Sequence, residues 1–155
     1  MNQNTDIAST GRKEYITFRI GEQEFCVDIT ATREIRGWSH ATSLPYSPDY
    51  IIGVINLRGS ILPIMDLSAR LGMGRSEPSE RHVIIVANVS ERFIGLLVDS
   101  VSDILNAGSD DLQALPSGGS PDEEEVFRRV VVIENRLISE IALEAIMPEL
   151  ESVAA

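Results

Sequence analysis

The sequence predicts a mainly β protein, built as a sandwich or as small barrels. Short apolar segments recur about every eight to twelve residues, and turn-forming residues separate them. Several of these segments alternate apolar and polar side chains, which is typical of strands with one buried face. Segments with a helical period are few and short. Periodicity alone does not distinguish a sandwich from a barrel.

The first predicted elements are a polar, disordered tail at residues 1–13 and a hairpin after it. Residues 15–20 alternate, and after a turn at Gly21 the residues 24–29 alternate again. We expect the face with the larger apolar side chains to be buried. Cys26 alternates onto the opposite face, so we expect this thiol to be half-buried.

The middle of the chain predicts a second hairpin with an arginine on its turn. Residues 32–35 form a short extended piece, and two prolines indicate a loop before residue 51. Residues 51–55 and 61–67 are strand-like, and the polar break between them holds Arg58. A rigid, exposed turn would present the planar guanidinium of Arg58 to carboxylates of a partner. The alternative is an ordinary hairpin whose arginine is solvated.

The second half of the chain predicts further strands, a loop and a terminal helix. Residues 68–72 form at most one helical turn. Residues 106–125 are rich in Gly, Ser, Pro and acids, and they suggest a mobile loop. Leu143–Leu150 predicts a short helix, although its start is ambiguous because the apolar run fits both periods. The predicted strands cover residues 83–89, 93–98, 101–105, 130–133 and 136–143.

Composition and charge limit the classes of function. The net charge of −11 argues against binding to nucleic acid or to an anionic membrane surface. No apolar run approaches 18 residues, and the N-terminus lacks the features of a signal peptide, so we expect a cytoplasmic protein. A single cysteine agrees with a reducing compartment.

The sequence shows no pattern of catalytic or metal-binding residues. His40 and His82 have no partner pattern, and Cys26 has no neighbouring histidine. Zinc spacing, a nucleophile elbow and a phosphate-binding glycine loop are all absent from the sequence. We therefore predict no catalytic residue, no metal and no cofactor. A small β-barrel enzyme or ligand-binding domain remains the rival class.

One motif with three flanking segments carries a family resemblance. The motif is Gly53-x-x-Asn56-Leu57-Arg58-Gly59-x-x-x-Pro63-x-x-Asp66-Leu67. The flanking segments, in the same order as in the family, are Phe25–Ile29, Arg33–Trp38 with Leu44-Pro45 and Pro48, and Gly95–Leu105. Together they resemble the CheW chemotaxis coupling proteins, strongly from Tyr15 to Leu105 and weakly elsewhere.

The resemblance implies an all-β fold with two five-stranded, SH3-like barrel subdomains and a short C-terminal helix. Residues 14–150 would form a single CheW-like domain. The first barrel would take about residues 14–80 and the second about residues 81–145, with the helix at 143–150.

The resemblance also implies a function and partners. The protein would be a non-catalytic adaptor that couples the cytoplasmic tip of transmembrane chemoreceptors to the regulatory domain of a CheA-type histidine kinase. It would lie in the cytoplasm, associated with receptor arrays at the inner face of the membrane. An adaptor of a pilus-motility or other chemosensory pathway is the alternative, and the sequence does not separate the two.

Site residues follow from the resemblance position by position. Core packing is the alternative role for Ile84 and Val98, and burial in its strand is the alternative for Ile61. We expect Gly53, Asn56, Gly59 and Pro63 to shape the hairpin rather than to touch a partner. The receptor-binding candidates are Thr32, Glu34, Arg58, Val83, Ile84, Val98 and Asp99, and the kinase-binding candidates are Leu44 and Ile61.

Three features depart from the family pattern. Thr32 replaces a residue that is usually aliphatic, Arg128-Arg129 replaces a glycine region, and Glu140 interrupts an apolar run. These departures leave open the choice of receptor and the interface of the second barrel with the kinase. One hypothesis is that the two arginines pair with the acidic run at residues 123–125.

Overall fold

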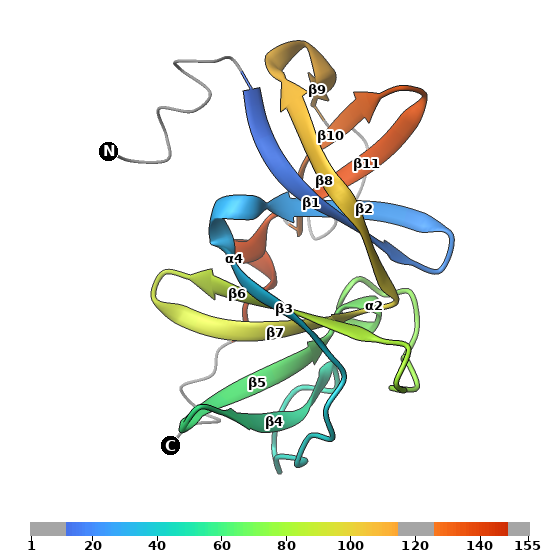
Figure 1. Ribbon diagram of the computed structural model, residues 1–155. Coiled ribbons are helices and arrows are strands. Elements are labelled where there is room, and N and C mark those ends of the chain that lie inside the picture. Colours follow the sequence, from blue (N-terminus) through green and yellow to red (C-terminus); the bar gives the residue numbers. More distant parts are fainter. Residues whose placement is uncertain (1–11, 115–125, 149–155) are drawn as a thin grey trace. The chain divides into compact units, whose positions relative to one another are not determined.

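The computed structural model describes residues 12–114 and 126–148, and it confirms the predicted mainly β fold (Figure 1). The strands are β1 (Arg12–Ile20), β2 (Gln23–Asp28), β3 (Thr32–Gly37), β4 (Ile51–Leu57), β5 (Ser60–Asp66), β6 (Val83–Val89), β7 (Arg92–Val98), β8 (Ser100–Gly108), β9 (Leu112–Gln113), β10 (Phe127–Ile133) and β11 (Arg136–Ile141). The helices are the short α2 (Leu67–Arg70) and α4 (Leu143–Ile146), with 3-10 turns η1 (Ile29–Ala31) and η2 (Ser109–Asp111). Within the described ranges, no helix has the length and apolarity that crossing a membrane requires.

The chain forms two compact units, and their division corrects the predicted one. Of the described residues, unit 1 takes 12–31, 101–114 and 126–145, and unit 2 takes 32–100 and 146–148. The expected boundary near residue 80 falls inside unit 2. The reason is that β2 pairs in parallel with β11, so the first hairpin completes a sheet with the last strands. Periodicity reports local elements and carries no signal for such long-range pairing.

Unit 1 is built on a sheet with the strand order β8-β1-β2-β11-β10-β9. It has six strands rather than the expected five, because β9 adds a two-residue strand at one edge. One face of this sheet holds a core cluster of Tyr15, Cys26, Leu105, Ala107, Val131 and Ile138. On the other face Phe25 stacks between Phe18 and Phe127, with ring centroids 6.0 Å apart in each pair.

The first hairpin therefore has two buried faces, and the expectation of one buried face was wrong. Tyr15 and Thr17, expected on the exposed face, are fully buried. Cys26 is also fully buried rather than half-buried. Alternation identified the two faces correctly, but the strand pattern does not report that β8, β10 and β11 place a core against the second face.

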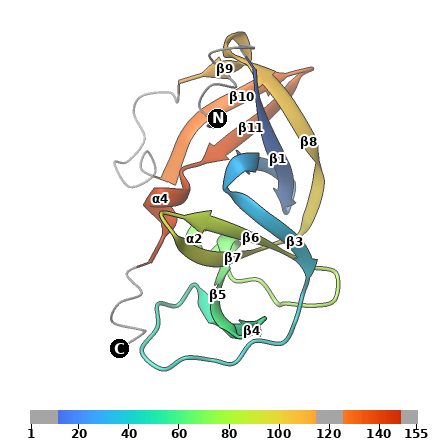
Figure 2. The same ribbon diagram turned by 60° about the vertical axis from the view of Figure 1, so that its left-hand side comes forward.

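Unit 2 is built on a five-stranded sheet with the order β3-β6-β7-β5-β4, in which β5 and β7 are parallel. Its core consists of Ala41, Ile55, Leu62, Ile64, Ile84, Val86 and Leu97. Gly95 lies directly against this core, since a Cβ there would be only 2.7 Å from Ile64 and 2.8 Å from Ile84. Figure 2 shows the long connection from β3 to β4 as an extended loop at the end of the sheet.

That connection is attached to β4 at one point. Thr42 forms an isolated bridge with Val54, with both backbone N–H···O distances at 2.8 Å. The bridge requires Gly53, because a Cβ at this position would lie 2.3 Å from the carbonyl oxygen of Thr42. The glycine thus allows the loop backbone to lie directly on the hairpin strand.

The remaining elements differ from the prediction in extent, and the predicted loop differs in type over residues 106–113. The terminal helix covers Leu143–Ile146, and residues 149–150 lie outside the described residues. The predicted mobile loop begins instead as the end of β8, followed by η2 and β9, and its residues 115–125 lie outside the described part. Most of the predicted N-terminal tail also lies outside it, although Arg12 and Lys13 belong to β1.

Candidate functional site

The hairpin of β4 and β5 ends in a two-residue turn that exposes Arg58. Leu57 pairs with Ser60, so Arg58 and Gly59 are the central turn residues. Both have positive φ, 51° and 88°, which is the backbone twist that matches antiparallel strands in a tight hairpin. The Asn56 side chain accepts a hydrogen bond of 2.9 Å from the Gly59 N–H. The turn is thereby held in shape by its own residues.

Arg58 forms an ion pair with Glu34 on strand β3. The Nη2 of Arg58 lies 2.5 Å from the Oε1 of Glu34, and the Arg58 side chain is 72% exposed. Arg36 lies near the other carboxylate oxygen of Glu34, at 3.8 Å. An exposed pair of this kind contributes about 0–1 kcal/mol to stability. Sequence reasoning selected both residues as candidates but did not predict that they would pair.

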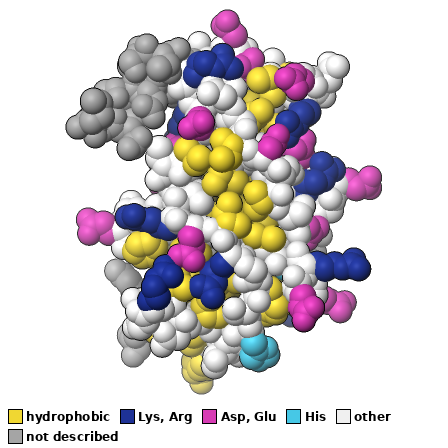
Figure 3. Space-filling model, in the orientation of Figure 1, with side chains coloured by type: hydrophobic (Ala, Val, Ile, Leu, Met, Phe, Trp, Pro, Cys, Tyr) yellow, Lys and Arg dark blue, Asp and Glu magenta, His cyan; other side chains and the backbone are white. Residues whose placement is uncertain are grey.

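Exposed apolar side chains lie next to this ion pair. Phe93 at the start of β7 is 45% exposed, and the guanidinium of Arg33 lies 5.7 Å from the centre of its ring. Two pockets of about 390 Å³ each meet here, and Leu57, Arg58 and Phe93 line both. Figure 3 shows basic side chains grouped around an acidic one, beside hydrophobic side chains, over the region of β3 and β7.

Phe93 and Arg33 were missed as site residues. Phe93 follows the polar turn at residues 90–91 and alternates with Gly95 and Leu97. It therefore continues the core face of β7 to the start of the strand, where its side chain is only partly buried. An aromatic side chain at that position was the available signal.

The structure places the other candidates in different environments. Ile84 is fully buried in the unit 2 core, and Val98 is 1% exposed, as their packing alternatives describe. Asp99 is partly exposed and lies 3.4 Å from the Nε2 of His82. Ile61 is 66% exposed on β5, unlike its alternative of burial in the strand. The half-exposed candidates are Thr32 at the start of β3, Leu44 in the connecting loop, Pro63 on β5 and Val83 on β6.

Comparison with known proteins decides the family. A model of the CheW-like domain matches residues 14–151. The chain belongs to the CheW-like family. It is 53% identical over 147 residues to "Chemotaxis protein CheW" of Rhizobium meliloti (strain 1021), covering 95% of each chain. It is 54% identical over 145 residues to "Probable chemotaxis protein CheW" of Rhizobium etli, covering 94% of each.

A solved structure of the same family has a similar fold. The crystal structure of the scaffolding protein TtCheW from Thermoanaerobacter tengcongensis superposes with a TM-score of 0.77 at 26% identity. The match covers 83% of this chain and 88% of that one. The two units described above are thus the SH3-like barrel subdomains of a CheW-like fold. In unit 1, β2 from the start of the chain pairs with β11 from near its end.

Two of the departures from the CheW pattern form a single cross-strand pair. Arg129 on β10 is the register partner of Glu140 on β11, and its Nε lies 3.0 Å from the Oε1 of Glu140. The Glu140 side chain is 3% exposed, and burial raises the pKa of its carboxyl while the charge of Arg129 opposes this effect. Arg128 pairs with Glu144 at 2.6 Å. These carboxylates are the partners the structure gives to the two arginines, and residues 123–125 of the earlier hypothesis lie outside the described part.

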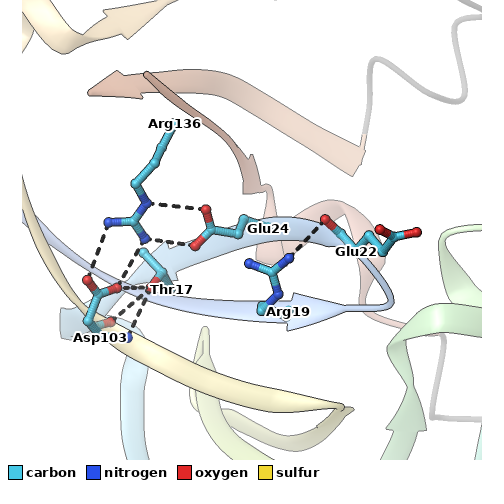
Figure 4. Close-up of polar contacts among 6 residues, drawn as sticks. All are labelled: Thr17, Arg19, Glu22, Glu24, Asp103 and Arg136. Carbon is cyan, nitrogen blue, oxygen red and sulfur yellow. Dashed lines mark hydrogen bonds and ion pairs between the residues drawn. The ribbon is translucent and has the colours of Figure 1, made fainter. Parts of the chain in front are cut away.

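A second polar cluster in unit 1 joins four strands (Figure 4). The guanidinium of Arg136 donates to both carboxylate oxygens of Glu24, at 3.2 and 2.7 Å, and to both of Asp103, each at 3.3 Å. Thr17 donates a further hydrogen bond to Asp103. These contacts, with the Thr17 hydroxyl first, lower the pKa of the Asp103 carboxyl. The cluster connects β1, β2, β8 and β11 and stabilises unit 1.

The described residues offer little for catalysis. Among residues 12–114 and 126–148, no group of three or more His, Cys, Asp or Glu side chains is placed to bind a metal ion. Burial raises the pKa of the Cys26 thiol, and the charge of Glu140 adds to the shift, so the thiol stays protonated. The exposed charges and apolar side chains of unit 2 are instead suited to binding another protein.

Proposed function

We propose that this chain is a non-catalytic adaptor of a chemotaxis signalling array, which couples transmembrane chemoreceptors to a CheA-type histidine kinase. Membership of the CheW-like family supports this function. The observation that carries it is the exposed hairpin turn, where Arg58 and Glu34 lie beside the partly exposed Phe93. The protein would act on the cytoplasmic side of the membrane, next to the receptor tips.

The receptor would bind at the pocket beside the hairpin turn that is lined by Arg33, Glu34, Leu57, Arg58 and Phe93. An amphipathic helix binds in a groove with an apolar floor and charges at its rim. Leu57 and Phe93 supply apolar surface, while Arg58 and Glu34 supply the charges. Thr32, Val83 and Asp99 would extend the contact along β3 and β6 and beyond β7. Ile84 and Val98 would act by shaping the sheet, because neither exposes a surface to bind.

The kinase would bind on the other exposed apolar positions of unit 2. Ile61 is 66% exposed on β5 and would supply apolar surface to this contact. Leu44 lies in the loop that connects β3 to β4 and is half-exposed. Each contact would be weak, and the repetition of contacts in an array would raise the effective affinity.

The test is a reconstituted signalling assay. Membrane-bound receptors and the kinase are incubated with ATP, with and without this protein, and autophosphorylation is measured. The wild type should raise kinase activity strongly, and Arg58→Glu should not. Arg81→Glu is the matched control, because Arg81 is an exposed arginine of unit 2 that lines none of these pockets. No activation by wild type, with competent receptors and kinase, would refute the proposal.

A further inference from the structure

A third pocket of unit 2, also of about 390 Å³, carries the inference. It lies beside the β4–β5 hairpin and is lined by residues of β3, of the connecting loop and of β4. We infer that this pocket binds an acidic side chain of the kinase's regulatory domain. Its polar lining residues are Arg36, Ser39, His40, Thr42 and Asn56, and the exposed Ile61 forms part of its wall.

The pocket lies between the two edge strands of the unit 2 sheet, which do not pair with each other. Strands β3 and β4 are the two edge strands of that sheet. Arg36 of β3 and Asn56 of β4 line the same pocket, so the two edges approach each other there without pairing. Thr42 bridges to Val54 and bounds the pocket on the loop side. Unpaired strand edges present polar groups to an incoming chain.

The side chains that line the pocket favour an anion. The Nε of Arg36 is buried and has no hydrogen-bond acceptor in the structure. Its Nη1 is 3.8 Å from Glu34, which is longer than a hydrogen bond. A buried donor without an acceptor is unfavourable, so a ligand that supplies one is favoured. The exposed imidazole of His40 adds a second donor to the same pocket.

A carboxylate fits this arrangement better than other acceptors. The planar guanidinium of an arginine matches a carboxylate in two parallel hydrogen bonds. The hydroxyl groups of Ser39 and Thr42 line the pocket as well and can donate to the remaining lone pairs. The protein as a whole carries a charge of −11, so an acidic partner would be repelled from most of its surface. A local basic pocket would therefore also fix where such a partner binds.

The occupant is a protein segment rather than a free anion because Ile61 lies in the same wall. This side chain is 66% exposed, and a small anion in the pocket would leave it in water. A segment that carries an acidic residue next to an apolar one would cover both. The inference rests on the proposed function, since that function assigns the protein contact at Ile61 to the kinase.

The experiment measures binding of the full-length kinase to the full-length adaptor by calorimetry, without receptors. Arg36→Gln should weaken binding by about tenfold or more, as expected when one partner of a paired charge is removed. His40→Gln should weaken it by about threefold, which is typical of one lost hydrogen bond. Arg81→Gln, an exposed arginine outside the pocket, should bind like the wild type. The wild-type affinity should also depend more steeply on salt than that of Arg36→Gln.

A second measurement follows the pocket itself by NMR. The Nε–Hε resonance of Arg36 should shift when the kinase is added, because the buried Nε gains an acceptor. Inorganic phosphate alone serves as the small-anion probe. A shift with phosphate but none with the kinase would overturn the inference in favour of a small-anion site.

The binding results distinguish a failure of the inferred acidic contact from a failure of the proposed adaptor function. If the wild type binds the kinase and both Arg36→Gln and His40→Gln bind equally well, the inference is wrong while the adaptor function stands. If Arg36→Gln does not fold, His40→Gln decides alone, because His40 is an exposed loop residue. If the wild type does not bind the kinase, the kinase contact of the proposed function fails, and the inference fails with it.

Discussion

The two units use their arginines differently. In unit 1, Arg136 makes four hydrogen bonds to two carboxylates, and Arg129 pairs with a carboxylate that is almost fully buried. In unit 2, Arg58 is 72% exposed and contacts Glu34 through a single nitrogen, while the Nε of Arg36 has no acceptor. Unit 1 thus uses charge to hold its strands together, whereas unit 2 leaves the charge of Arg58 largely exposed.

The largest effect is expected at the buried pair of unit 1. Arg129→Gln leaves the buried carboxylate of Glu140 without its partner and should lower the free energy of unfolding by about 2–4 kcal/mol. Urea denaturation measures the loss. Glu144→Gln is the control, because Glu144 is 66% exposed. Loss of its ion pair with Arg128 should lower the free energy of unfolding by less than about 1 kcal/mol. A loss in Arg129→Gln no larger than in Glu144→Gln would contradict the structural role of the pair.

The next effect is expected at the four-strand cluster. Arg136→Ala removes hydrogen bonds to Glu24 and Asp103 and should cost about 1–2 kcal/mol, since the group is partly exposed. Arg19→Ala serves as the control, because Arg19 bonds only the backbone oxygen of Glu22 among the contacts in Figure 4. Both variants should still activate the kinase. Loss of activation in a folded Arg136→Ala protein would extend the binding surface into unit 1.

A smaller effect on stability is expected at the hairpin turn of unit 2. Arg58→Glu should lower the free energy of unfolding by no more than about 1 kcal/mol, because the ion pair with Glu34 is exposed. The same variant should abolish coupling. Thermal unfolding and kinase activation, measured on one preparation, test this separation. A large loss of stability would mean that the turn holds unit 2 together.

The dependence of stability on pH should also differ between two groups of unit 1. Burial raises the pKa of Glu140 above its ordinary value of 4.5, so the folded state holds this proton more tightly than the unfolded state. Its contribution to stability therefore grows as the pH falls from neutral toward 4.5. The pKa of Asp103 is lowered below 3.8, so its contribution is lost as the pH falls below that value. Urea titrations from pH 7 to pH 3 should show the gain in the wild type and not in Glu140→Gln.

The individual strands and turns could largely be predicted from local alternation of apolar and polar residues. The division into two units depends on which strands pair over long distances in the sequence. Alternation located the first hairpin, and the polar break at residues 56–60 located the turn that presents Arg58. The unit boundary was not predictable in this way, because the parallel pairing of β2 with β11 joins segments more than one hundred residues apart (Cys26 and Glu140). The burial of Cys26 was missed for the same reason.

The candidate site was predicted in part. The family resemblance identified Glu34 and Arg58 as candidates. Their contact depends on how β3 approaches the hairpin, which no sequence spacing encodes. Glu140 and Arg129 looked like separate departures from the family pattern, and only the register of β10 and β11 makes them a pair. Phe93 and Arg36 became candidates only once the pockets were known.

The most direct test of partner binding at this surface exchanges the two charges of the exposed pair. The double variant Glu34→Arg/Arg58→Glu keeps an ion pair between β3 and the hairpin but reverses the charge presented to a partner. Kinase autophosphorylation is measured with membrane-bound receptors, and folding is checked by thermal unfolding. We expect a stable protein that does not activate the kinase. Full activation by the exchanged pair would show that Arg58 and Glu34 only hold the barrel together, and it would contradict the assignment of this surface to partner binding.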